Sequence, residues 1–290
     1  MPELPEVETT IRGLKKKVLK RTFIVVWTDW KKTIKKPKDF KRFQKELKNK
    51  KIQKIWRRGK NIILELSQGY SLLIHQKLTG HLLHGIWNLE SGIWIPKNDS
   101  NLKEKVNSYI HLMFFLDNGK MLALSDLRKF AKVELWKTEE LLNSEEFKKL
   151  GPEPLERSFT FEKFKKTLAN KKGKIKQVLM NQEIIAGIGN IYSDEALWRA
   201  RIHPFKNVSK LKEKELKQLY KRIKEVLEKS VKLHGESFSD YRDIEGRRGR
   251  FDEMRKVYGR EKEKCFRCKS EIKRLKIGGR SAHFCPKCQK

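Results

Sequence analysis

The chain has 290 residues, of which 69 are lysine or arginine and 36 are aspartate or glutamate, so its formal net charge is +33. This length allows about two domains, and the positive charge favours a polyanionic partner such as nucleic acid, although a generally lysine-rich composition would spread charge without making a site. Hydrophobic residues make up 38% of the chain, which excludes a disordered basic tail. No apolar run reaches the roughly 18 residues of a membrane helix, and the acidic, amphipathic N-terminus is not a signal peptide.

The first residues, Met-Pro-Glu-Leu-Pro-Glu, suit two different roles. A small second residue permits removal of Met1, which leaves Pro2 with a free secondary amine. An α-amine ordinarily has a pKa of about 7.7–8.0, so its unprotonated fraction can attack a carbonyl-like carbon and form an iminium. Glu3 and Glu6 lie within one helical turn of this amine. The same residues also suit a capped helix, because Pro5 fits a first turn and glutamates oppose the positive end of the helix dipole.

Residues 20–136 are predicted to be mostly β, as an antiparallel sandwich flanked by helices, which makes the chain an α+β multidomain protein. Branched and aromatic residues predict strands at 21–27, 52–55, 62–66, 71–75, 109–116, 121–125 and 132–135, and an amphipathic helix is expected at 37–50. Between two of these strands, residues 57–60 form a basic turn that ends in Lys60. Most such turns are simply solvated hairpin tips.

A Leu-Gly-Pro-Glu-Pro segment at 150–154 interrupts the β pattern, and helical periodicity follows it. Helices are predicted at 161–170, 175–181, 191–200 and 209–233, and residues 235–250 are expected to form a mobile loop. Gly187 and Gly189 allow a tight turn with exposed N–H groups at a helix start, which suits phosphate binding but is often only structural. The expected division is an N-terminal domain at 1–137, a linker at 138–150, a helical domain at 151–236 and a loop with a zinc finger at 237–290.

All four cysteines lie in the last 26 residues, as two CxxC pairs with 16 residues between them. They are Cys265, Cys268, Cys285 and Cys288. This spacing is typical of a zinc ribbon, and four thiolates leave no open position, so we expect one structural Zn²⁺. The residues between the pairs predict a β-hairpin, with Arg280 beside its Gly-Gly turn, that has too little core to fold without metal. A reducing, cytoplasmic setting follows more easily than disulfides.

Ordered motifs run from the first residues to the last. They are Pro2-Glu3-Leu4-Pro5-Glu6-Val7-Glu8-Thr9, Arg58-Gly59-Lys60, Asp126-Leu127-Arg128-Lys129-Phe130, Leu150-Gly151-Pro152-Glu153-Pro154-Leu155, Gly187-Ile188-Gly189-Asn190-Ile191-Tyr192, Val257-Tyr258-Gly259-Arg260, Gly279-Arg280-Ser281 and Cys285-Pro286-Lys287-Cys288-Gln289. Over its whole length the chain therefore resembles the formamidopyrimidine-DNA glycosylases, the helix–two-turn–helix DNA glycosylase family.

The resemblance implies a catalytic set of five residues. Pro2 would attack C1′ of the damaged nucleoside and form the imine, Glu3 would handle protons at the sugar, and Glu6 would support it. Lys60 would lie near the phosphate and sugar, and Arg280 on the zinc hairpin would grip the flanking phosphate. The iminium makes the C2′ proton acidic, so strand cleavage by elimination would follow from the same intermediate.

The resemblance also implies DNA contacts. Leu78, Arg128 and Phe130 would fill the gap left by the flipped-out base, and Lys176 and Asn190 would meet the backbone. The other expected DNA-binding residues are His75, Tyr109, Lys171 and Tyr258. Extruding a base costs a few kcal/mol, which wedge residues and phosphate contacts offset.

The chain departs from the commonest family pattern in three places. The usual His-Leu-Gly-Met-Ser-Gly is here His75-Gln76-Lys77-Leu78-Thr79-Gly80, so Leu replaces the wedge Met with a similar volume. Asp-Leu-Arg at 126–128 replaces Asp-Pro-Arg, and Tyr109 and His111 stand where many members have one DNA-contacting His. These differences concern lesion and opposite-base preference, not the reaction.

The implied function is a bifunctional DNA glycosylase and AP lyase of base excision repair. It would excise 8-oxoguanine and formamidopyrimidines through a Pro2 Schiff base and nick the strand by β,δ-elimination. An endonuclease VIII-type enzyme for oxidised pyrimidines is the close alternative, and a non-catalytic damaged-DNA-binding protein is a different class. The expected partner is double-stranded DNA with an oxidised base or abasic site, bound by a monomer in the bacterial cytoplasm, at the nucleoid.

Overall fold

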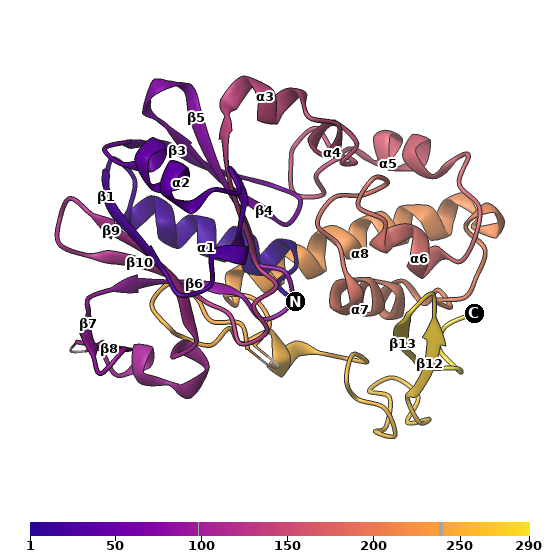
Figure 1. Ribbon diagram of the computed structural model, residues 1–290. Coiled ribbons are helices and arrows are strands. Elements are labelled where there is room, and N and C mark those ends of the chain that lie inside the picture. Colours follow the sequence, from indigo (N-terminus) through magenta and orange to yellow (C-terminus); the bar gives the residue numbers. More distant parts are fainter. Residues whose placement is uncertain (98, 238–239) are drawn as a thin grey trace. The chain divides into compact units, whose positions relative to one another are not determined.

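The computed structural model describes residues 1–97, 99–237 and 240–290 (Figure 1). The chain divides into two compact units, Met1–Lys148 with Leu233–Arg250, and Lys149–Lys232 with Phe251–Lys290. The domain boundaries expected from the sequence stay a prediction, but the structure groups Leu233–Arg250 with the first unit rather than with the zinc finger. No described helix combines the length and apolar composition needed to cross a membrane.

The first unit contains the predicted β-sandwich. One sheet has the strand order β1 (Phe23–Thr28), β9 (Ile110–Leu116), β10 (Met121–Ser125) and β6 (His81–Gly85). The other has the order β2 (Ile34–Lys36), β11 (Lys132–Lys137), β5 (Tyr70–His75), β4 (Asn61–Leu66) and β3 (Ile52–Arg58). Neighbouring strands are antiparallel except β2 and β11, which are parallel. A separate hairpin joins β7 (Trp87–Glu90) to β8 (Ile93–Pro96).

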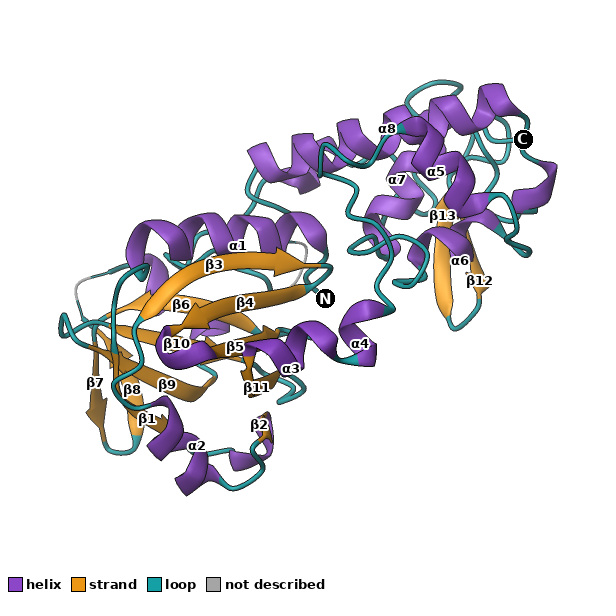
Figure 2. Ribbon diagram, turned by 90° about the horizontal axis from the view of Figure 1, so that it is seen from above, coloured by secondary structure: helices purple, strands orange, loops and turns teal. Residues whose placement is uncertain are grey.

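Helix α1 (Leu4–Lys17) starts the chain and lies along β3 and β4 (Figure 2). A capping box between Glu3 and Glu6 begins it, and three lysines in its last turn suit the negative end of the helix dipole. Its buried residues Val7, Ile11 and Leu14 join one core with inward-facing residues of both sheets, such as Leu72 and Phe114. Burial of this stripe therefore fixes which face of α1 packs on the sandwich.

Two short helices occupy the segment expected to be a linker. They are α3 (Thr138–Asn143) and α4 (Glu145–Lys148). Leu141 and Phe147 pack with Ile63 and Leu73 on the outer face of the five-stranded sheet. Helices this short are barely stable in isolation, so we attribute their formation to this packing. The hydrophobic periodicity of the sequence did not predict it. Helix α2 (Phe40–Leu47) is shorter than expected because Asp39 caps it, accepting a hydrogen bond from Arg42 N at 2.6 Å.

The second unit contains four helices, α5 (Phe161–Leu168), α6 (Ile175–Met180), α7 (Asn190–Ala200) and α8 (Glu213–Lys232), and a hairpin of β12 (Lys273–Ile277) and β13 (Arg280–Phe284). Short 3₁₀ turns in the two units lie at Lys31–Thr33, Ser67–Gly69, Asn101–Lys103, Lys105–Asn107, Val208–Lys210 and Phe251–Met254.

The two turns between α6 and α7 are stabilised by Gln182. Its side-chain amide donates to Met180 O and Ile188 O and accepts from Gly187 N, each at 2.8 Å. Gly151 packs on these turns, since a Cβ there would lie 2.5 Å from the Ile184 carbonyl oxygen. The expected helix–two-turn–helix arrangement is thus present.

Residues 235–250, expected to be a mobile loop, are mostly held against the first unit where they are described, and residues 238 and 239 lie outside the described residues. The Tyr241 hydroxyl donates to Glu6 O at 3.0 Å. Ile244 belongs to the main core and packs on Gly13, where an added Cβ would lie 2.7 Å from it. These contacts explain why the segment groups with the N-terminal unit. A few isolated apolar residues in a polar stretch did not predict them.

Three histidines in the first unit make its stability depend on pH. Burial lowers the pKa of His81 and, with nearby lysines, lowers the pKa of His75 to about 3 and of His84 to about 4. An unfolded histidine has a pKa near 6.5, so below that pH the unfolded chain binds protons that the native unit does not. We expect full stability above about pH 6.5, and a loss as pH falls below it of about 1.4 kcal/mol per pH unit for each histidine. Urea unfolding between pH 5.5 and 7.5 measures this slope. His84→Gln should reduce it, and a slope unaffected by that substitution would contradict the assignment.

Candidate active site

Four of the predicted catalytic residues meet at one end of the five-stranded sheet. Lys60 lies in the two-residue turn that joins β3 to β4, with Gly59 at φ 58°. Helix α1 starts at the same end of the sheet. Its place there follows from the charge of Lys60, which, like those of Glu3 and Glu6, is close enough to the N-terminal amine to shift the pKa of that amine. Pro2 is buried, and Glu3, Glu6 and Lys60 are 2%, 1% and 7% exposed. The structure therefore places the amine, two carboxylates and an ammonium together in a largely dry environment.

The environment of this end shifts the N-terminal amine toward its nucleophilic form. The pKa of the Met1 α-amine is lowered, chiefly because burial disfavours the charged form; Lys60 lowers it further, while Glu3 and Glu6 raise it. Pro2 is the next residue and is buried, so we expect its nitrogen to lie in the same surroundings once Met1 is removed. A lowered pKa increases the unprotonated fraction near neutral pH, which iminium formation requires.

Glu6 orients the start of the chain. Its Oε2 accepts a hydrogen bond from Glu3 N at 2.7 Å, and its Oε1 accepts one from Glu236 N at 2.8 Å. Gly235 has no side chain to obstruct this contact, because a Cβ there would lie 2.8 Å from Glu6 Oε1. With both oxygens accepting backbone N–H groups, this carboxylate fits the supporting role expected for it. The partner at 236 was missed, since sequence reasoning does not pair residues so far apart.

His75 ends β5 beside this site, opposite Asn61 on β4 and Lys132 on β11. Its Nδ1 lies 3.0 Å from Lys77 N and accepts that hydrogen bond. Burial, followed by Lys77, Lys60 and Lys132, lowers the pKa of His75 to about 3, so the ring is neutral near pH 7. The proton must then sit on Nε2, which leaves one N–H for an acceptor such as a phosphate oxygen.

The residues expected to fill the base gap, Leu78, Arg128 and Phe130, lie on two neighbouring segments, 77–80 and 126–131, which we call the wedge loop. A buried carboxylate holds these segments in shape. Asp126 Oδ1 accepts a hydrogen bond from the Thr79 hydroxyl, and its Oδ2 accepts one from Ala131 N at 2.7 Å. Arg128 N donates to the same hydroxyl at 3.1 Å, which ties the segments of Leu78 and Arg128 together. Phe130 is 50% exposed, with the Arg128 guanidinium 4.9 Å from its ring centre. Both side chains thus project from a fixed loop, as base-gap filling requires.

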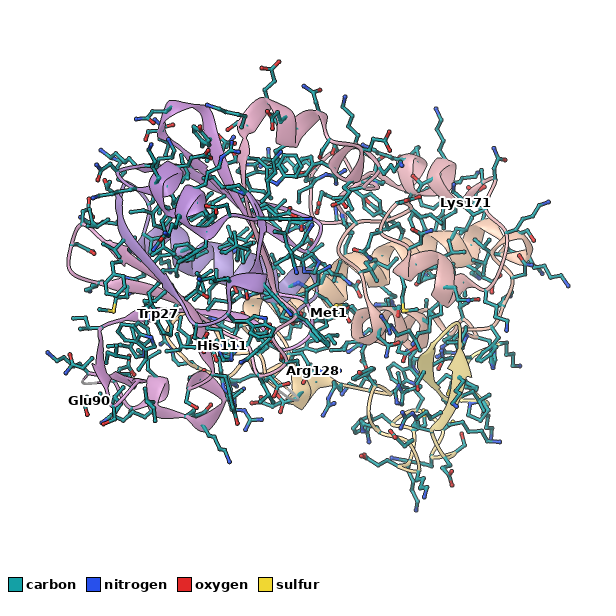
Figure 3. The ribbon with its side chains drawn as sticks, viewed as in Figure 1. Met1, Trp27, Glu90, His111, Arg128 and Lys171 are labelled. Atoms are coloured by element: carbon teal, nitrogen blue, oxygen red, sulfur yellow. The ribbon has the colours of Figure 1, made fainter. Side chains whose placement is uncertain are left out.

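Tyr109 and His111 differ in their surroundings. His111, labelled in Figure 3, has its Nδ1 3.0 Å from both carboxylate oxygens of Asp29, so its ring is already engaged with an anion. Tyr109 is half-buried, and its carbonyl accepts a hydrogen bond from Asp126 N at 2.8 Å, next to the wedge loop. A contact of Tyr109 with DNA stays a prediction.

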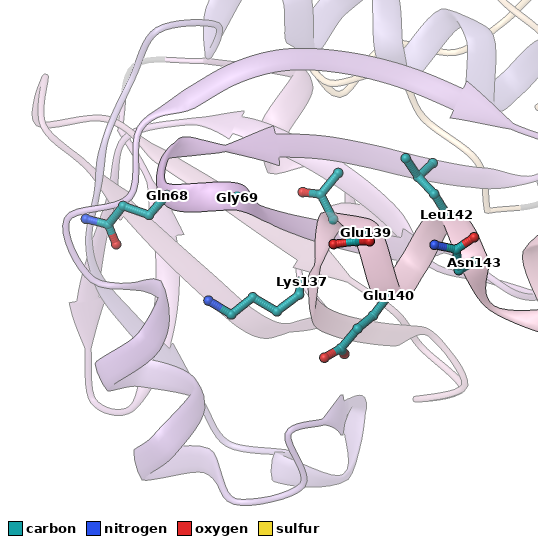
Figure 4. A pocket seen from close by; sticks show the side chains of 8 residues that line it. Gln68, Gly69, Lys137, Glu139, Glu140, Leu142 and Asn143 are labelled. Atoms are coloured by element: carbon teal, nitrogen blue, oxygen red, sulfur yellow. The ribbon is translucent and has the colours of Figure 1, made fainter.

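A pocket of about 980 Å³ lies at the other end of the five-stranded sheet (Figure 4). It is lined by Gln68, Gly69, Lys137, Thr138, Glu139, Glu140, Leu142 and Asn143. Tyr70 and Lys137 are paired at that end, whereas His75 is paired with Lys132 at the catalytic end. The pocket is therefore separate from the catalytic residues.

In the second unit, Lys176 does not have the position expected of a direct DNA contact. Its side chain is fully buried, and its Nζ lies 2.6 Å from Asp194 Oδ1 and 2.6 Å from Ser281 O. Asp194 Oδ2 also accepts a hydrogen bond from His283 N at 2.9 Å. The expectation that Lys176 meets the DNA backbone is thus corrected: the ammonium holds the β13 backbone next to Arg280 instead.

The other expected DNA contacts of this unit are at least partly accessible. Lys171 and Arg280 are exposed, and Asn190 and Tyr258 are half-buried (Lys171 is labelled in Figure 3). Asn190 is the first residue of α7, directly after the glycine turn. Arg280 follows Gly278 and Gly279, which have φ values of 51° and 70°. Their roles at DNA stay predictions.

Removing one partner of the buried Lys176–Asp194 pair is expected to destabilise the second unit by about 3–5 kcal/mol, because an uncompensated charge stays behind in a dry site. Lys176→Met tests this by hydrogen–deuterium exchange of α6, α7 and β13. Lys217→Met is the matched control, since the Lys217–Glu213 pair on α8 is exposed and such pairs contribute little. Equal exchange in both variants would show that the buried pair does not stabilise the unit.

The four cysteines form one cluster, with their sulfur atoms all within 4.8 Å of one another. Four thiolates at this spacing fit tetrahedral Zn²⁺ with no open position, so the metal is structural. Cys265 and Cys285 pack with Trp198 of α7, Val257 and Ile272. Arg267 lies 3.7 Å from the Trp198 ring centre and donates to Trp198 O at 2.7 Å. The zinc site is therefore built directly against α7.

Comparisons with known proteins agree with this geometry. Family models match residues 1–133 (formamidopyrimidine-DNA glycosylase N-terminal domain), 150–242 (formamidopyrimidine-DNA glycosylase H2TH domain) and 262–290 (zinc finger found in FPG and IleRS). The formamidopyrimidine-DNA glycosylase of Heliobacterium modesticaldum is 39% identical over 295 residues, covering 100% of both chains. That of Pelotomaculum thermopropionicum is 39% identical over 292 residues, covering 100% of this chain and 99% of its own.

Solved structures give the same result. A mutant FPG of Lactococcus lactis in complex with DNA containing Fapy-dG has a TM-score of 0.86 and 36% identity, with 100% of both chains covered. A MutM complex with carbocyclic 8-oxo-G DNA has a TM-score of 0.85 and 35% identity, again with 100% of both chains covered. The chain belongs to the formamidopyrimidine-DNA glycosylase family.

Proposed function

We propose that this protein is a bifunctional DNA glycosylase and AP lyase of base excision repair that excises oxidised purines from double-stranded DNA. The observation that carries the proposal is the buried position of Pro2 at the end of the sheet that also holds the buried side chains of Glu3, Glu6 and Lys60. An amine in this setting suits attack on an electrophilic sugar carbon, and the net charge of +33 suits a polyanionic substrate. DNA with Fapy-dG or 8-oxo-G in the complexes of related proteins supports the same substrate class.

The reaction begins once Met1 has been removed. The Pro2 nitrogen bonds to C1′ as the bond from C1′ to the base breaks. The base leaves with the electron pair and takes up a proton, which balances the proton that the Pro2 nitrogen gives up. The sugar ring opens to the iminium as O4′ takes a proton, which Glu3 supplies. Loss of the C2′ proton then expels the 3′ phosphate, and a second elimination expels the 5′ phosphate. Hydrolysis finally releases Pro2.

An enzyme for oxidised pyrimidines remains the alternative, because a structure of wild-type Lactococcus lactis FPG contains oxidised-pyrimidine DNA. We favour purines because the curated relatives are named formamidopyrimidine-DNA glycosylases, after a purine lesion, and because Fapy-dG or 8-oxo-G lies in the DNA of several similar complexes. A non-catalytic damage-binding protein would have no need of Pro2, Glu3 and Lys60 together at one end of the sheet.

The test is a panel of duplexes that carry 8-oxoguanine, a formamidopyrimidine, an oxidised pyrimidine or an abasic site, with varied opposite bases. We expect excision of both purine lesions, two-step strand cleavage, and a covalent adduct after borohydride reduction. Excision of pyrimidine lesions alone would overturn the substrate assignment. Lesion binding with no adduct and no cleavage would favour the non-catalytic alternative.

Arg280 is proposed to hold a phosphate beside the lesion. It follows a two-glycine turn, and the Lys176 ammonium fixes the next carbonyl, Ser281 O, at 2.6 Å. Arg280→Ala should weaken lesion-DNA binding by about 1–3 kcal/mol and lower the slope of log affinity against log salt by about one. Arg280→Lys should restore the slope but not the two-pronged contact. Lys273→Ala, an exposed residue of the same hairpin, is the control. Unchanged slopes and affinities in all variants would make Arg280 a solvated side chain.

The relatives reported above are bacterial proteins. We propose that the enzyme works in the bacterial cytoplasm at the nucleoid, where its DNA substrate is found. Fluorescent labelling at the C-terminus, with DNA staining, tests this and leaves the N-terminal amine unmodified.

A further inference from the structure

Gln76 is a buried amide without a hydrogen-bond partner. Its side chain is 1% exposed, and among residues 1–97, 99–237 and 240–290 neither its Oε1 nor its Nε2 has a partner. Buried polar groups in native proteins are nearly always hydrogen-bonded, and an exception calls for an explanation such as a missing ligand or water. A Leu or Met would fill the same space without this penalty, so packing alone does not explain Gln76.

The strand register places Gln76 at the catalytic end of the sheet. His75 pairs with Asn61 on β4 and with Lys132 on β11. One step further along these antiparallel pairs, Gln76 comes opposite Lys60 on one side and Ala131 on the other. The Ala131 side is supported directly, because a Cβ built on Gly80 would lie 2.5 Å from Gln76 O and 3.2 Å from Ala131 Cβ.

The alternation of side chains along β5 indicates which face Gln76 is on. Leu72 and Ile74 belong to the core that contains Val7 and Ile11 of α1. Leu73 belongs instead to the cluster on the outer face. Because side chains alternate along a strand, Gln76 continues the row that faces α1. It therefore lies at the end of the sheet where α1 begins, the end that holds Pro2 and Glu3.

We propose that Gln76 is a substrate-contacting residue whose amide hydrogen-bonds to the sugar-phosphate of the lesion nucleotide. This inference rests on the proposed function, because it takes the amine of Pro2 to act on C1′ of that nucleotide. A deoxyribose-phosphate offers only oxygen acceptors in its closed form and gains a hydroxyl when the ring opens. An amide carries both a donor and an acceptor, so it can donate to the oxygens of the closed form and also accept from the new hydroxyl, whereas a lysine only donates and a carboxylate only accepts.

The competing explanation is that Gln76 merely fills space or holds an ordered water. Gln76→Met separates the two, since Met has a similar length and volume but cannot make a strong hydrogen bond. If Gln76 contacts substrate or merely fills space, the variant is as stable as the wild type or more so, because a desolvated amide is removed. If Gln76 holds an ordered water, the variant loses those hydrogen bonds and its thermal midpoint falls. Only a substrate contact also predicts weaker binding of lesion DNA. Gln53→Met, on an exposed position of β3, is the matched control.

The experiment measures the thermal midpoint of each free protein and its affinity for three duplexes: undamaged, carrying a tetrahydrofuran abasic-site analogue, and carrying 8-oxoguanine. For Gln76→Met we expect an unchanged or higher midpoint, about 10-fold weaker binding of both lesion duplexes, and unchanged binding of undamaged DNA. Equal loss on both lesion duplexes is required, because the analogue has a sugar-phosphate but no base.

Wild-type affinities for both lesion duplexes, or a loss confined to 8-oxoguanine, would overturn the proposal. A lower midpoint with equal losses on all three duplexes would show a structural role and would also overturn it. Failure of the proposed function gives a different result, since the wild-type protein itself would then neither prefer lesion DNA nor form a borohydride adduct.

Discussion

A chain whose Pro2 amine is blocked is expected to lose base excision and strand cleavage by at least ~10³-fold, the scale on which enzymes lose activity without a central catalytic group. Inserting Lys between Met1 and Pro2 achieves this, because a large second residue prevents removal of Met1. We expect so large a loss because Pro2 is the residue that lies among the buried side chains of Glu3, Glu6 and Lys60. In the extended chain the nitrogen of Pro2 is an amide with no basic lone pair, so no iminium can form.

The measurement is single-turnover cleavage of an 8-oxoguanine duplex together with borohydride trapping, after mass spectrometry confirms each N-terminus. A lysine added after Lys290 is the control, because it adds the same residue and leaves the amine intact. Binding of the abasic-site analogue, measured in parallel, reports whether the extension also displaces DNA. Normal cleavage by a protein with verified Met1 retention would exclude Pro2 as the nucleophile.

Removal of zinc is expected to unfold the β12–β13 hairpin and to reduce lesion-DNA affinity to the level of undamaged DNA. Structural zinc contributes about 10–16 kcal/mol of apparent binding free energy in small zinc-finger modules, far more than this hairpin's own core can replace. Cys265 and Cys285 pack on Trp198, so disorder should extend to the C-terminal end of α7. The sandwich of the first unit contains none of these ligands and should stay folded.

Chelation followed by elemental analysis prepares the metal-free protein, and hydrogen–deuterium exchange measures the two units separately. Cys268→Ser provides a second route that leaves no chelator in the sample. Restored exchange protection and DNA binding after zinc is added back would show that the loss is reversible. Normal lesion binding by a verified metal-free protein would contradict the structural role of the metal.

Local sequence predicted the features that depend on local chemistry. The start of α1 after Glu3, the turn at Lys60 and the zinc hairpin all occur where turn residues, caps or ligand spacing placed them. Each depends on residues within about a dozen positions, whose geometry the backbone itself restricts. The β-sandwich followed from the same kind of pattern, because strands with one buried face alternate in a recognisable way.

Features that depend on distant partners were not predictable in this way. From the sequence, Lys176 is expected to be an exposed cation. Its partners, Asp194 and Ser281 O, lie close to it only in the folded chain. Similarly, Thr and Asp are residue types that usually lie at the surface. In the fold Thr79 and Asp126 are buried, and their hydrogen bond holds the wedge loop. Whether a charged side chain is buried depends on the groups that pack around it. These groups come from distant parts of the chain, so the residues next to the charge in sequence do not reveal them.

The attachment of residue 236 to Glu6, 230 positions away, has a consequence for protein synthesis. A ribosome makes the N-terminus first, and Met1 can be removed long before the segment that fixes Glu6 and fills the space beside Gly13 has emerged. The amine of an unfinished chain therefore lacks its final setting, and contacts of such long range also close slowly. We therefore expect prematurely terminated products that end before this segment to carry a free Pro2 without the ability to cut DNA.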